Sequence, residues 1–88
     1  MSGLRGSLAN AFVAAKSAQQ MKDIRSLAEY SAKWLDSAFW WHRQGEVWRS
    51  LGRVENVEMC GRESDTCRLI SSILLARIGE LAPSSEAA

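Results

Sequence analysis

Apolar residues recur every three or four positions along most of this 88-residue chain, which is the spacing of one face of an α-helix. Residues that favour helices dominate, and no stretch alternates between apolar and polar residues beside an Asn-Gly or Asp-Gly turn. The pattern therefore predicts an all-α fold, in the form of a small bundle of three to four helices.

The first predicted helix covers residues 4–19. Its apolar stripe consists of Leu8, Ala11, Phe12 and Ala15. A second helical stretch covers residues 23–51, and Gly52 is expected to end it because glycine adopts the left-handed cap conformation at little cost. The spacing leaves open whether this stretch is one helix or two helices broken near residues 36 and 37.

Two further helices are predicted in the C-terminal third of the chain. A short one starts near Val54, and a last one covers residues 64–81 with Ser64 or Asp65 as its N-cap. The buried stripe expected for the last helix is Leu69, Ile70, Ile73, Leu74, Ile78 and Leu81. Because Pro83 cannot continue a helix, we expect one helical domain over residues 1–82 and a flexible tail over residues 83–88.

Large and small side chains form two parallel rows in the second stretch. Trp34, Trp41 and Trp48 are seven residues apart, and Leu27 extends their row by one more heptad. Four residues after each comes a small one, in the order Ser31, Ala38, Gly45 and Gly52. The small row predicts a groove in which a neighbouring helix packs closely. The residues expected in the structural core are Leu27, Trp34, Trp41, Gly45, Trp48 and Leu51.

Two aromatic residues, Phe39 and Trp40, lie off the tryptophan row. They extend the apolar surface beyond the arc that one helix contact covers. Tryptophan and arginine are enriched at binding hot spots, so Phe39, Trp40, Arg43 and Arg49 are the candidate partner-binding residues. The alternative is that the first or last helix of the same chain buries the two aromatic residues.

Residues 38–52 resemble one helix of a tetratricopeptide repeat. The matching positions are Trp41, Gly45, Trp48, Leu51 and Gly52. The match departs from the family pattern at Gln44, where leucine is usual, and at Gly61, where a bulky aromatic residue is usual. The resemblance implies an antiparallel helix array that binds other proteins. Helical endosomal scaffolds with a BRO1-type domain contain similar elements between long helices.

The charge balance argues against nucleic acid as a partner, and the distribution of apolar residues argues against a membrane span. Eleven basic residues face ten acidic ones, a net charge of +1, so no strong field draws the chain to nucleic acid. No run of 18 apolar residues exists to span a membrane.

The first 22 residues contain three basic residues and no acidic one, which resembles a mitochondrial import sequence. A cytoplasmic location is the expectation, and a mitochondrial one the alternative.

The inventory of reactive residues is small. The chain has one histidine, His42, and two cysteines, Cys60 and Cys67, whose spacing on a helix is too wide for a disulfide. No catalytic motif, metal site or cofactor site is predicted. The expected function is a non-catalytic adaptor or assembly factor that binds another protein or itself. The alternative is a structural subunit or fragment of a larger helical assembly, such as a BRO1-like scaffold or an organellar complex.

Overall fold

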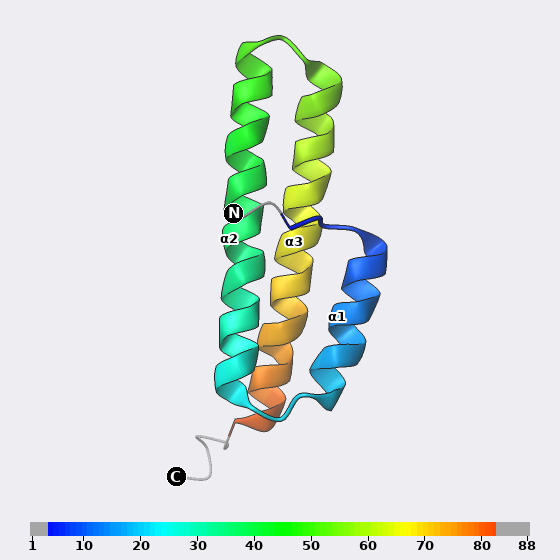
Figure 1. Cartoon of the computed structure of the whole chain (residues 1–88), viewed down its shortest axis with the longest axis vertical. Coiled ribbons are helices and arrows are strands. Elements are labelled where there is room, and N and C mark those ends of the chain that lie inside the picture. Colours follow the sequence, from blue (N-terminus) through cyan, green and yellow to red (C-terminus); the bar gives the residue numbers. More distant parts are fainter. Residues whose placement is uncertain (1–3, 83–88) are drawn as a thin grey trace.

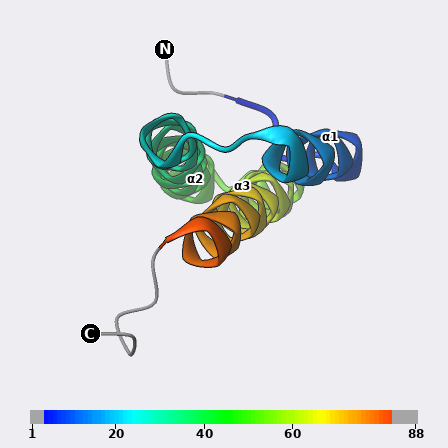
Figure 2. The ribbon, with the colours of Figure 1, turned by 90° about the horizontal axis from the view of Figure 1, so that it is seen from below.

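Three α-helices make up the part of the chain that the computed structural model describes, residues 4–82 (Figure 1). They are α1 (Leu8–Gln20), α2 (Ile24–Ser50) and α3 (Val54–Leu81). Helices α2 and α3 form a long antiparallel hairpin, and α1 runs beside the C-terminal half of α3 in the same direction (Figure 1). Viewed along the helices, the three axes form a triangle in which α3 contacts both neighbours (Figure 2). The all-α prediction is confirmed, and the predicted tail over 83–88 lies outside the described residues.

Helix α2 is a single helix, which settles the question that the sequence left open. Ser37, at the expected break, is buried and donates its hydroxyl to the Lys33 carbonyl at 3.0 Å. Gly52 ends the hairpin arm with a φ of 72°. The Gly52 N–H donates to the Arg49 carbonyl at 3.1 Å, and the Arg53 N–H donates to the Trp48 carbonyl at 3.0 Å. These two bonds form the Schellman motif of a helix C-terminus, so the predicted glycine cap is confirmed.

Helix α3 is also continuous, so the prediction of two separate helices between residues 54 and 81 was wrong. Ser64 is not an N-cap. It is buried, and its hydroxyl donates to the Ala38 carbonyl of α2 at 2.8 Å. A serine that finds a partner on the next helix has no need to compete with its own helix for hydrogen bonds. The cap-like sequence therefore marks a helix contact and not a helix start.

Small residues from both arms of the hairpin face one another along a seam. The hydroxyls of Ser31 and Ser71 lie 2.8 Å apart. Gly45 lies against Cys60, since a Cβ built on the glycine would be 3.4 Å from the cysteine Cβ. The groove expected beside the tryptophan row is thus where α3 packs. The small residues of α3 also let the two backbones approach closely.

The tryptophan row faces the core for most of its length. Leu27, Trp34 and Trp41 are buried, and Trp48 is half-buried. The expectation for Leu51 was wrong, because its side chain is 63% exposed. It is the C-cap residue of α2, at the tip where the chain turns away from the helix.

Candidate interaction surface

The two aromatic residues expected to bind a partner lie on different flanks of α2. Consecutive helix residues are about 100° apart around the axis. Phe39 is 48% exposed, and the guanidinium carbon of Arg68 lies 5.7 Å from its ring centre. Trp40 is half-buried and packs edge-on against Trp41, with ring centres 4.9 Å apart. The rest of the chain therefore covers Trp40 more fully than Phe39.

The two arginines of the same prediction are exposed. Arg49 forms an ion pair with Glu46 one turn earlier on α2. This pair lies at the surface, where such interactions contribute little to stability. Arg43 follows Phe39 by four residues and Trp40 by three, so these three residues are neighbours on α2. That the four residues bind a partner stays a prediction.

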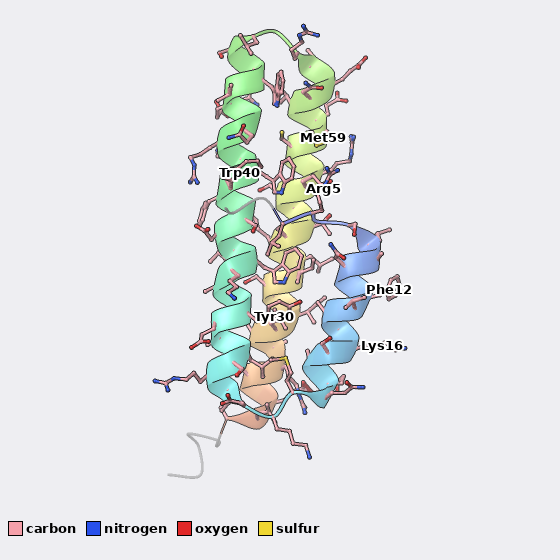
Figure 3. The ribbon with its side chains drawn as sticks, viewed as in Figure 1. Arg5, Phe12, Lys16, Tyr30, Trp40 and Met59 are labelled. Carbon is pink, nitrogen blue, oxygen red and sulfur yellow. The ribbon has the colours of Figure 1, made fainter. Side chains whose placement is uncertain are left out.

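Helix α1 turns its smallest residues inward. Its buried residues are Ala11, Ala14 and Ala18, and they belong to the same core cluster as Trp34 and Trp41. The predicted stripe was wrong at its two large positions, because Leu8 is 72% exposed and Phe12 is 71% exposed. Phe12 points away from the other two helices in Figure 3. The small inward face lets α1 pack closely on α3, and the large side chains of α1 face outward.

These outward side chains form one wall of an apolar groove. The groove has a volume of about 240 Å³ and lies between α1 and α3. Its lining residues are Leu8, Ala11, Phe12, Ala15, Leu69 and Ile73. Leu69, which the sequence assigned to the buried stripe of the last helix, is 49% exposed here. Every lining residue is apolar, and an exposed apolar groove on a small protein is a candidate contact surface.

A short N-terminal segment, residues 4–7, holds one end of α1 on the hairpin. The Leu4 carbonyl accepts a hydrogen bond from Trp41 Nε1 at 2.7 Å. The Gly6 N–H donates to the Glu63 carboxylate at 2.5 Å, and the Arg5 guanidinium pairs with the same carboxylate at 3.0 Å. This segment crosses α3 in Figure 1. It places α1 in register with α3.

The other end of α1 is held by Arg77 of α3. Its Nε donates to the Ala18 carbonyl at 2.9 Å, and its Nη2 donates to the Gln19 carbonyl at 3.2 Å. A cation at these last carbonyls also opposes the negative end of the helix dipole. Both anchors were missed from the sequence, because Arg77 and Glu63 are ordinary charged residues there. Nothing marks the residues that they bind, which lie 57 to 59 positions away.

The two thiols are buried and unpaired. Burial, with a smaller effect from the nearby Glu63 carboxylate, raises the pKa of Cys67 to about 11 and also raises the pKa of Cys60. A thiol with a raised pKa carries little thiolate and is a poor nucleophile. His42 is exposed. No group of three His, Cys, Asp or Glu residues within 4–82 is arranged to hold a metal ion.

No protein-family model, curated protein or solved structure matches this chain. The resemblance to tetratricopeptide repeats therefore stays a prediction. Within the described residues, no helix combines the length and hydrophobicity needed to cross a bilayer.

Proposed function

We propose that this protein is a non-catalytic protein-interaction module and that the groove between α1 and α3 receives a helix of its partner. The observation that carries the proposal is the exposure of large apolar side chains on both walls of one groove. Leu8 and Phe12 come from α1, and Leu69 comes from α3. An apolar patch on a small protein is a common mark of a binding surface.

A helix is the ligand that this groove suits. Its two walls are neighbouring helices that run in the same direction (Figure 1). Its lining residues on each wall are spaced by three or four, so they form ridges. A fourth amphipathic helix laid along the groove would pack its apolar stripe between these ridges, as in helix-in-groove recognition, and would complete a four-helix bundle.

A photo-cross-linking amino acid placed in the full chain, one position at a time, tests this proposal in cells. Phe12 and Leu69 are the groove positions, Phe39 represents the aromatic surface that the sequence suggested, and Asp36 is an exposed control on α2. We expect the two groove positions to cross-link to protein efficiently. Positions 39 and 36 should give only background, because no groove surrounds them.

Two results would contradict the proposal. Cross-linking from position 39 that exceeds cross-linking from positions 12 and 69 would move the binding surface to the part of α2 around Phe39. Background levels at all four positions would mean that the chain does not act as an interaction module under these conditions, and the proposed function would fall.

A further inference from the structure

We propose, on the basis of the function above, that the partner at the groove is a second copy of this chain, which covers the groove with its own α1–α3 face and is related by a two-fold axis that sets α3 antiparallel to its counterpart. The order of side chains along the outer face of α3 carries this proposal. That face is self-complementary in both hydrophobicity and charge.

Four residues of α3 define the face. Arg62, Leu69, Ile73 and Glu80 are separated by seven, four and seven residues, so they follow one line along the helix. The line is symmetrical about position 71, with the two apolar residues near its centre and the two opposite charges at its ends. When a second α3 runs antiparallel across this point, Leu69 of each copy meets Ile73 of the other.

The same arrangement brings Arg62 of one copy to Glu80 of the other, twice. The two charges are 18 residues apart, about 27 Å along the helix, so they cannot reach each other within one chain. No ion pair of Arg62 is found among residues 4–82, and Glu80 has only a 3.8 Å contact with Arg77. Arg77 itself donates to the carbonyls of Ala18 and Gln19. An antiparallel copy would give each of these two exposed charges an oppositely charged partner.

Helix α1 is placed to contribute at the centre of the same interface. Gly6 lies against Glu63 and Cys67, and Ala18 lies against Arg77. Phe12, midway between these two anchors, is therefore level with position 71 of α3. The axis passes beside both Phe12 rings, so the one aromatic side chain of α1 packs against its own copy. Lys16 lies one turn farther along α1, and α1 contains no acidic residue that could pair with it.

The area of this face is suited to a dimer of moderate affinity. Five turns of α3 span about 27 Å, and two adjacent helices are about 20 Å wide. The projected area is on the order of 500 Å² per copy, near the lower limit for a specific interface. We therefore expect a dimer that dissociates in the micromolar range and not an obligate one.

Charge reversal tests the register, with the dissociation constant measured by sedimentation equilibrium on the full chain. Arg62→Glu and Glu80→Arg each create two like-charge contacts and should weaken the dimer about tenfold. The double variant restores both pairs with reversed polarity and should return to within about twofold of the original value. Arg25→Glu and Glu29→Arg, on the exposed side of α2, are matched controls and should change nothing. All five proteins should keep the same circular dichroism spectrum.

A monomer at all concentrations up to about 1 mM would overturn the second copy as occupant. If the groove positions 12 and 69 still cross-link to another protein in cells, the proposed function stands with a different partner. If a dimer forms but the double variant stays as weak as the single ones, the antiparallel register is wrong. Loss of groove cross-linking altogether would instead count against the interaction function itself.

Discussion

Gly6 is the residue at which the N-terminal segment comes closest to α3. A Cβ built on it would lie 2.9 Å from the Cys67 backbone nitrogen and closer still to the Glu63 carbonyl oxygen. Both are backbone atoms of a helix, so neither can move aside as a flexible side chain would. Gly6 is needed here for close approach, and not for an unusual φ angle.

Gly6→Ala is therefore expected to lower the free energy of unfolding by about 1–3 kcal/mol, the usual cost of overpacking. The matched control is Gly61→Ala on α3, where an added Cβ has nothing within 4 Å. In that mid-helix position, alanine should raise the free energy of unfolding by about 0.5–1 kcal/mol. Urea denaturation followed by circular dichroism measures both. If the two variants changed stability in the same direction, the contact between the segment and α3 would be wrong.

The sequence could predict some single residues and not others, for physical reasons. Heptad spacing placed Trp34 and Trp41 in the core correctly, because a helix period fixes which side chains share a face. It failed for Phe12, because periodicity identifies an apolar stripe but not whether a neighbour has room for it. It could not find Gly6 at all, because the atoms that exclude a side chain there lie on α3, far along the chain.

At the scale of the element, the α2–α3 seam depends on small residues from both helices. The sequence revealed the small row of α2 but not its counterpart on α3. Cys60, Ser64 and Ser71 of α3 are polar or weakly apolar, so a hydrophobic pattern gives them no weight. Ser64 even suggested a helix start. Its hydrogen bond to the Ala38 carbonyl shows why a polar residue is stable in this buried seam.

Ala38→Leu tests how closely the two arms must approach. Ala38 is fully buried, and its carbonyl accepts from Ser64 on the facing helix. Three extra carbons would push the arms apart, so we expect a loss of about 2–3 kcal/mol in the free energy of unfolding. Ala32→Leu makes the same change on the exposed face of α2 and should stay within about 0.5 kcal/mol.

Urea denaturation of both variants, with tryptophan emission as the probe, gives the comparison. Equal stability of the Ala38 and Ala32 variants would mean that the seam accommodates a leucine and that close approach is not required. A large loss at Ala32 instead would place a partner or another helix on the face that is exposed in this structure.

At the scale of the whole molecule, the hairpin and α1 are held by different kinds of interaction. The hairpin buries tryptophan, leucine and isoleucine side chains. Helix α1 buries three alanines and relies on hydrogen bonds at its two ends. Each buried methyl contributes only about 0.8 kcal/mol, against about 1.5–3 kcal/mol for a buried leucine or phenylalanine. The sequence predicted a helix here but began it about one turn too early, at residue 4 instead of Leu8. It did not predict this weak attachment, which depends on which side chains α2 and α3 present to α1.

We therefore expect α1 to detach from the hairpin without global unfolding. In native-state hydrogen exchange, the amides of Ala14 and Ala18 should exchange through an opening whose free energy is about 2–4 kcal/mol below that of Ala38 and Trp41 in α2. The difference follows from the smaller side chains that α1 buries. Equal values in the two helices would mean that α1 belongs to the same cooperative unit as the hairpin.

Protein concentration separates the attachment of α1 from its proposed contact with a second copy. If two copies pack through Phe12 and Leu69, detachment of α1 requires the dimer to dissociate first. Exchange at Ala14 and Ala18 should then slow as the protein is concentrated through the micromolar range, by mass action. In the Arg62→Glu variant the same amides should exchange fast at every concentration, because the α1 anchors are intact but the dimer is weakened. Concentration-independent exchange in the unmodified chain would show that the apolar groove stays open to solvent when the protein is alone, and that its partner is a different molecule.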